Sequence, residues 1–220
     1  MLSIKVLVKN LDYDSLIKLG LPILRANPPD FDTKKIINKA IKKSLDMLLK
    51  VDESKFMSAV ETIPTSIKRY LAIIIISKSH SKIEAFIKSF TESHNLVLEV
   101  SNIFIEKEDN SSSDTLLIGC DVIELGYSSF IKKFLPTIHF DDNGNEMNLF
   151  LNALFPALIS EYSSIERIIN SIDNIILEKF IIYLINQNKE KILQLLTAGI
   201  NEKGISLVVD ALIIEHLNKE

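Results

Sequence analysis

The chain opens with apolar residues at every second position, and the same alternation returns near its middle. The alternating residues are Leu2, Ile4, Val6 and Val8, and then Leu116, Ile118, Cys120 and Val122. A spacing of two places such side chains on one face of an extended strand. Both segments are therefore predicted to be strands of a small, mostly antiparallel sheet that helices cover on its apolar side.

Between these strands, apolar residues recur every three or four positions, which is the spacing of an amphipathic helix. In the first half, helices are predicted at about 13–21, 33–50, 54–63, 66–77 and 79–91, with Pro22 ending the first of them. Residues 71–76 and 180–185 are apolar on every side. Each run is predicted to lie in a central, buried helix, although a run of isoleucines also favours a strand.

Each half closes with a predicted strand, at about 96–105 and 205–214. The apolar positions change phase inside both strands; in the first, Leu98 and Val100 are followed by Ile103. One extra residue in a strand produces such a change. β-Bulges are therefore predicted near two dipeptides: Ser101 and Asn102, and Asp210 and Ala211.

The two halves of the chain also resemble each other residue by residue. Residues 116–138 match residues 2–24 at ten of twenty-three positions, at a constant shift of 114 and without a gap. The ten identical residues of the first half are Leu2, Ile4, Val8, Leu11, Tyr13, Ser15, Ile17, Lys18, Leu21 and Pro22. Residues 82–106 match residues 191–215 at a shift of 109, with Lys82, Ile83, Leu98, Val100, Ile105 and Glu106 identical.

The change of shift from 114 to 109 places a five-residue deletion in the second copy, between the positions of Leu24 and Ile41. A period of about 110 residues is that of a whole domain rather than of a solenoid repeat. The sequence therefore predicts an α+β fold formed by tandem duplication of a β–(four or five helices)–β domain. The first repeat is residues 1–109, the linker is 110–113, and the second repeat is 114–220.

Composition places the chain among globular proteins, since 47% of its residues are hydrophobic and 25% are charged. Lys5 and Lys9 interrupt the first ten residues, so we expect no signal peptide. The longest apolar run, 70–76, is far shorter than the roughly 20 residues of a membrane span. With Cys120 as the single cysteine, no internal disulfide can form. We therefore predict a cytoplasmic protein with no membrane span.

The sequence nominates no catalytic, cofactor-binding or metal-binding residue. The four histidines are not paired at helical spacing, and glycine-rich phosphate loops and nucleophile elbows are absent. The segment from His139 to Gly144 fails the EF-hand spacing, because Phe150 occupies the twelfth place. The lysine cluster at 34–43 has no interleaved aromatic residues, so we interpret it as a solvated helix face and expect no nucleic-acid partner.

One candidate contact surface emerges when the two halves are compared. At the shift of 109, the polar positions Lys42, Asp46 and Lys50 of the first long helix correspond to Leu151, Phe155 and Ile159. Residues spaced by four form one stripe along a helix, and an apolar stripe in water favours association. Leu151, Phe155 and Ile159 are therefore predicted to bind a protein, either a second copy in a homo-oligomer or another chain. Packing of the first domain there, or a helix rotation around Pro156, would also cover them.

Three functional hypotheses follow from these observations. The leading one is a non-catalytic protein–protein interaction or assembly module built from two homologous domains. The alternative is a protein that binds or senses a small apolar, lipid-like ligand between the helices and the sheet. The third is an enzyme of unrecognised type, because an active site is defined by geometry rather than by spacing along the chain.

Overall fold

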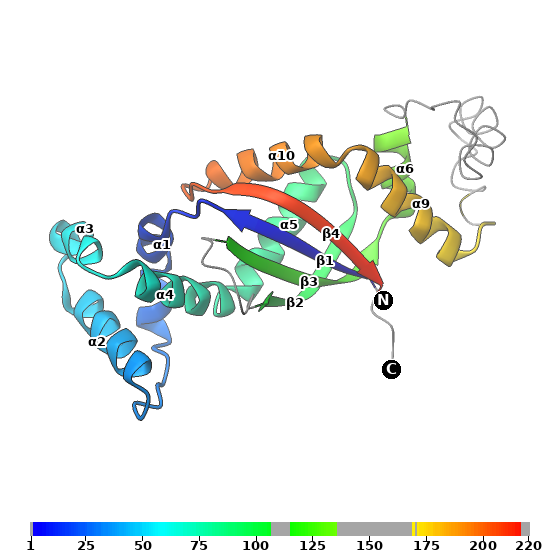
Figure 1. Cartoon of the computed structure of the whole chain (residues 1–220). Coiled ribbons are helices and arrows are strands. Elements are labelled where there is room, and N and C mark those ends of the chain that lie inside the picture. The colour runs from blue at the N-terminus through cyan, green and yellow to red at the C-terminus, as the bar shows by residue number, and fades with distance from the viewer. Residues whose placement is uncertain (1, 107–114, 136–168, 170, 217–220) are drawn as a thin grey trace. The chain divides into compact units, whose positions relative to one another are not determined.

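The computed structural model describes residues 2–106, 115–135, 169 and 171–216, and these residues form an α+β fold (Figure 1). The first half consists of β1 (Leu2–Lys9), α1 (Tyr13–Ala26), α2 (Ile36–Lys50), α3 (Glu53–Glu61), α4 (Thr65–Ser77), α5 (His80–Ser93) and β2 (Leu98–Glu106). The second half consists, as far as it is described, of β3 (Thr115–Leu125), α6 (Tyr127–Phe134), α9 (Asn174–Gln187), α10 (Lys189–Asn201) and β4 (Val208–His216). The five helices predicted for the first half are confirmed.

Two details of the helix prediction are decided by the structure. The isoleucine run of residues 71–76 belongs to α4, with Leu71 and Ile75 buried, so the helical interpretation of this run is confirmed. The expected end of the first helix at Pro22 is wrong, because α1 continues to Ala26 with Pro22 inside it. Leu21 and Leu24 are buried on either side of Pro22. Burial of these two leucines offsets the hydrogen bond that proline cannot donate.

The described strands form one antiparallel sheet in the order β2-β3-β1-β4. β1 therefore lies between β3 and β4, two strands from the other half of the chain. Along β1 and β3, Ser3 is opposite Asp121 and Lys5 is opposite Gly119. Along β1 and β4, Lys5 is opposite Ile213. The sheet is thus built by interleaving strands that are distant in sequence.

Both edge strands are irregular where the apolar phase changes. In β4, Ala211 is opposite Leu7 but Val209 is opposite Val8, so Asp210 is an extra residue. The predicted bulge at Asp210 and Ala211 is confirmed. In β2, Asn102 adopts a φ of 51°, a left-handed conformation that interrupts a regular strand. Its neighbours Val100 and Ile103 are both buried although they are three residues apart, as the predicted phase change requires.

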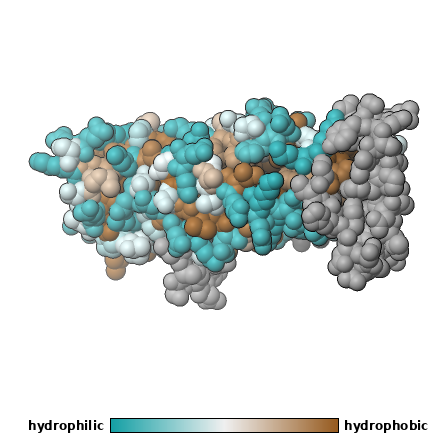
Figure 2. All heavy atoms as spheres, turned by 90° about the horizontal axis from the view of Figure 1, so that it is seen from above, coloured by the Kyte–Doolittle hydropathy of each residue, from teal (hydrophilic) through white to brown (hydrophobic). Residues whose placement is uncertain are grey.

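The chain forms two compact units. The larger unit consists of Met1–Phe86, Val100–Val122 and Leu193–Glu220, and the smaller of Ile87–Glu99 and Ile123–Ile192. The core of the larger unit joins α1–α4 to the apolar side of the sheet, where Val8, Leu116 and Val209 are buried. In the smaller unit, α6 packs against α9, and both bury apolar residues. Figure 2 shows patches of hydrophobic residues among hydrophilic ones on one face of the described residues.

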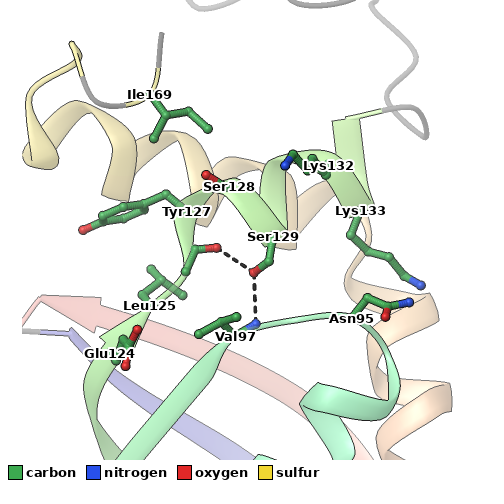
Figure 3. A pocket seen from close by; sticks show the side chains of 11 residues that line it. Asn95, Val97, Glu124, Leu125, Tyr127, Ser128, Ser129, Lys132, Lys133 and Ile169 are labelled. Atoms are coloured by element: carbon green, nitrogen blue, oxygen red, sulfur yellow. Dashed lines mark hydrogen bonds between the residues drawn. The ribbon is translucent and has the colours of Figure 1, made fainter. Parts of the chain in front are cut away.

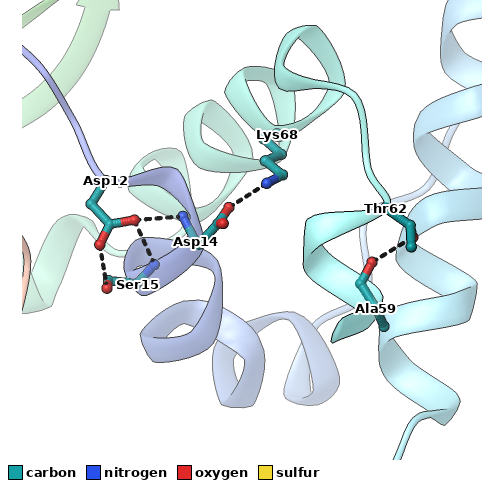
Figure 4. Close-up of polar contacts among 6 residues, drawn as sticks. All are labelled: Asp12, Asp14, Ser15, Ala59, Thr62 and Lys68. Carbon is teal, nitrogen blue, oxygen red and sulfur yellow. Dashed lines mark hydrogen bonds and ion pairs between the residues drawn. The ribbon is translucent and has the colours of Figure 1, made fainter. Parts of the chain in front are cut away.

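The beginning of α1 is held by polar contacts that join it to α4 (Figure 4). The Asp12 carboxylate accepts hydrogen bonds from the backbone N–H groups of Asp14 and Ser15, and a 2.6 Å bond from the Ser15 hydroxyl. Asp14 in turn forms a 2.7 Å ion pair with Lys68 of α4. The contacts satisfy backbone donors that the first turn of a helix leaves unpaired. Asp12 is therefore the N-cap of α1.

Candidate functional site

The apolar stripe predicted from the sequence, Leu151, Phe155 and Ile159, lies outside the described residues. Its polar counterparts of the first half, Lys42, Asp46 and Lys50, are all exposed on α2. The structure therefore supports the polar side of the comparison and leaves the apolar side as a prediction.

The side chains that most often carry chemistry do not converge in the described ranges. Within residues 2–106, 115–135 and 171–216, no group of three His, Cys, Asp or Glu side chains is placed to hold a metal ion. The Cys120 thiol is buried, and desolvation followed by the nearby Asp121 charge raises its pKa to about 11. A thiol with this pKa stays protonated at neutral pH and is a poor nucleophile. No helix among the described residues is long and apolar enough to cross a membrane.

The larger of the two cavities described here lies in the smaller unit, beside the start of α6 (Figure 3). Its volume is about 710 Å³. The lining residues come from the turn before β2, the end of β3, α6 and the segment before α9: Asn95, Val97, Glu124, Leu125, Gly126, Tyr127, Ser128, Ser129, Lys132, Lys133 and Ile169. It thus combines two lysines, a carboxylate, hydroxyl groups and exposed apolar surface.

One wall of this cavity is a hydrogen-bonded junction between the loop before β2 and the start of α6. The Gly126 N–H donates to the Val97 carbonyl at 2.9 Å. The Ser129 hydroxyl accepts from the Val97 N–H at 3.0 Å and donates to the Gly126 carbonyl at 2.7 Å. A β-carbon on Gly126 would lie 2.5 Å from Val97 Cβ, so only glycine allows this approach. Because its hydroxyl is occupied by backbone groups, Ser129 has a structural role.

The other polar groups of the cavity include the Tyr127 phenol and two lysines. The Tyr127 hydroxyl donates to Glu178 Oε1 at 3.4 Å, and burial followed by the Glu178 charge raises its pKa. The phenol therefore remains protonated at neutral pH and is no general base. Lys133 is exposed and Lys132 half-buried. The cavity offers positive charge and hydrogen-bond donors.

A second polar cluster lies on the side of the sheet opposite the helices. Lys5 Nζ is 2.8 Å from Glu106 Oε1 on β2 and 2.8 Å from Glu215 Oε2 on β4. The Lys5 side chain is 15% exposed, and its hydrogen bonds to Glu106 and then to Glu215 raise its pKa. Lys5 thereby ties both edge strands to β1.

Sequence reasoning singled out neither cluster as a site, although it contained a partial signal for each. Tyr127, Ser129 and Lys132 are among the residues that repeat Tyr13, Ser15 and Lys18, and Glu106 and Glu215 are also a repeated pair. Repetition led to the prediction that these positions are equivalent in the two halves. It did not indicate that they would meet across a sheet or around a cavity.

Comparison with known proteins adds no functional information. No family model, curated protein or solved structure matches this chain.

Proposed function

We propose that the protein is a non-catalytic assembly module built from two homologous halves that are interlocked through one sheet. The observation that carries the first part of this proposal is the strand order. Exchanging the halves replaces β1 by β3 and β2 by β4, and this exchange maps β2-β3-β1-β4 onto itself in reverse. The helix pairs α1 with α4 and α6 with α9, which both pack together, are also equivalent under the exchange.

The strand register supports the same equivalence at the level of single residues. Lys5 is opposite Gly119, and Gly119 is the residue that corresponds to Lys5 at the shift of 114. The pair Lys5 and Ile213 corresponds to Gly119 and Phe104, whose side chain fills the space that a β-carbon of Gly119 would occupy. A pseudo-two-fold axis through the Lys5–Gly119 pair accounts for these matches.

Two long-range hydrogen bonds are also related by the exchange. The Asp12 N–H donates to the Ser206 carbonyl at 2.8 Å, and the Gly126 N–H donates to the Val97 carbonyl at 2.9 Å. Asp12 and Gly126 differ by 114, and Val97 and Ser206 by 109. Each bond connects the residue that caps the first helix of one half to the segment just before the last strand of the other. An arrangement repeated in this detail supports descent from a symmetric dimer whose halves became joined.

Lys5 occupies the centre of this arrangement. The two glutamates that it binds, Glu106 and Glu215, are counterparts at the shift of 109. Because the counterpart of Lys5 is Gly119, which has no side chain, a single ammonium group binds both carboxylates near the axis. A partly buried, hydrogen-bonded group of this kind supports register more than stability, so we assign it a structural role.

Association is proposed to involve Leu151, Phe155 and Ile159 of the second half. The support is their correspondence to Lys42, Asp46 and Lys50, which are exposed on α2. Because these positions are polar in the first half and apolar in the second, only the second half is expected to form an assembly contact there. The small-ligand alternative has less support, because the two cavities described here are lined by lysines and polar groups as well as apolar residues.

The proposed contact is tested by giving the second half the residues of the first. The variant carries Leu151→Lys and Phe155→Asp, and its mass in solution is measured by light scattering together with its thermal unfolding. We expect the assembled wild type to become a folded monomer. The matched control, Lys42→Glu with Asp46→Lys on exposed α2, should leave the assembly state unchanged. If the double variant unfolds and the wild type shows no association, the stripe is part of the core and the proposal fails.

A further inference from the structure

The first turn of α2 is the most exposed apolar point of the described residues. Ile36, the first residue of the helix, is 89% exposed, and its neighbour Ile37 is 43% exposed. The rest of the outer face of α2 is polar, while Ile41, Leu45 and Leu48 face the core. Ile36 therefore departs from the amphipathic pattern of its own helix, and the core does not require it.

The turn that presents Ile36 has a defined structure. The Lys34 N–H donates to Asp32 Oδ1 at 3.1 Å, and the Asn38 side-chain amide donates to the Asp32 carbonyl at 2.9 Å. These bonds join the segment before α2 to its first turn. Ile36 and Ile37 are thus held at the end of a helix that is anchored in the core through its other residues.

Positive charge surrounds this apolar point. Residues 30–43 contain five lysines and two aspartates, a net charge of +3 in a chain whose total is −4. All five lysines are exposed, and none of them forms an ion pair within the described part of the chain: Lys34, Lys35, Lys39, Lys42 and Lys43. Lys39 and Lys43 follow Ile36 by three and seven residues and share its side of the helix.

We infer that the start of α2, with Ile36 at its tip, docks on an anionic lipid surface. An acyl-chain boundary removes isoleucine from water, and phosphate headgroups attract the surrounding lysines. A nucleic acid would neutralise the lysines but would give the isoleucines no apolar environment. Arginine is missing from residues 30–43, and no aromatic residue lies among the lysines of 34–43. A lipid surface is the partner that matches both the exposed isoleucines and the surrounding lysines.

This contact is peripheral and reversible. A few lysines and one or two aliphatic side chains do not anchor a protein permanently, so binding should rise with the fraction of anionic lipid and fall with salt. The inference does not depend on the proposed assembly function, because α2 belongs to the first half and the proposed contact to the second.

The absence of tryptophan makes a direct test possible. In Ile36→Trp the only indole of the protein reports the polarity at the tip. Vesicles of phosphatidylcholine with 30% phosphatidylserine should shift its emission to the blue, and pure phosphatidylcholine vesicles should not. The matched control is Ile175→Trp, because Ile175 is 61% exposed in the first turn of α9, where the single Lys179 is accompanied by Asp173 and Glu178 and the net charge is negative. Its emission should not change.

Sedimentation with the same vesicles, using proteins without the tryptophan substitution, then separates the contribution of the lysines from that of Ile36. Lys34→Ala with Lys35→Ala should lower partitioning about 25-fold, at roughly fivefold per lysine. Ile36→Asp should lower it at least about tenfold, with an unchanged melting temperature because Ile36 is exposed. The inference is overturned if the wild type does not sediment with anionic vesicles, or if Ile36→Asp sediments equally well. Heparin provides a further test. If heparin binds the wild type and Ile36→Asp equally well, and releases both proteins from the vesicles, the partner is a soluble polyanion and the inference is overturned.

Discussion

At the scale of single residues, Gly20 shows how closely α1 and α4 approach each other. A β-carbon at Gly20 would lie 2.4 Å from Ile75 Cγ2, and Ile75 is only 2% exposed. Real β-carbons do not come this close to other atoms. With any larger residue at position 20, either the Ile75 side chain or one of the two helices would have to move.

We predict that Gly20→Ala destabilises the protein. Overpacking costs about 1–3 kcal/mol, and the better helix propensity of alanine returns about 1 kcal/mol, so the net loss is up to about 2 kcal/mol. Urea unfolding measures the change. Ile75→Ala removes the clashing side chain, and the double variant should therefore be more stable than the sum of the two single effects predicts. Strict additivity would contradict the contact.

At the scale of an element, Asp12 controls the start of α1. The pKa of Asp12 lies below its usual value of 3.8, chiefly because the Ser15 hydroxyl donates a hydrogen bond to the carboxylate. A lowered pKa in the folded protein means that the carboxylate stabilises the fold above the ordinary aspartate pKa. This stabilisation disappears as the pH falls through the lowered value.

Asp12→Ala should therefore cost about 1 kcal/mol of unfolding free energy at pH 7. The difference between wild type and variant should stay constant down to about pH 5 and should shrink below about pH 4. Ser15→Ala is the companion variant, because it removes the main cause of the pKa shift and keeps the carboxylate. Denaturant unfolding at several pH values provides the measurement. A difference that grows toward low pH would show that the sign is wrong.

At the scale of the whole molecule, the interleaved strands make the two halves depend on each other. β1 of the first half is paired on both sides with strands of the second half, β3 and β4. Two domains that folded separately would each pair their own first and last strands. Here the hydrogen bonds of the sheet cross from one half to the other.

We therefore expect the halves to remain associated after the chain is cut between them. A protease site replaces residues 110–113 in the 220-residue chain, and gel filtration follows cleavage. Both fragments should elute together in buffer and separate only in denaturant, because the β1–β3 and β1–β4 pairings do not require the covalent link. The uncut protein with the same site serves as the control. Separation of two folded fragments in buffer would contradict the interleaved sheet.

Local spacing along the chain was sufficient for much of the fold. The alternation from Leu2 to Val8 predicted β1 and its buried side, and the helical spacing predicted α1–α5 to within a few residues. The phase change after Val209 predicted the bulge at Asp210. The strand, the helices and the bulge all depend on which side of an element is buried, and residues a few positions apart decide that side.

Only the tertiary structure decided the strand order, the continuation of α1 through Pro22, the contact of Lys5 with Glu106 and Glu215, and the cavity beside Gly126. The comparison of the halves predicted equivalent elements but not which strands would pair. Strand pairing joins backbone groups more than a hundred residues apart, and alternating strands satisfy many registers equally well in isolation. The packed sheet selects among these registers through contacts that no local pattern contains.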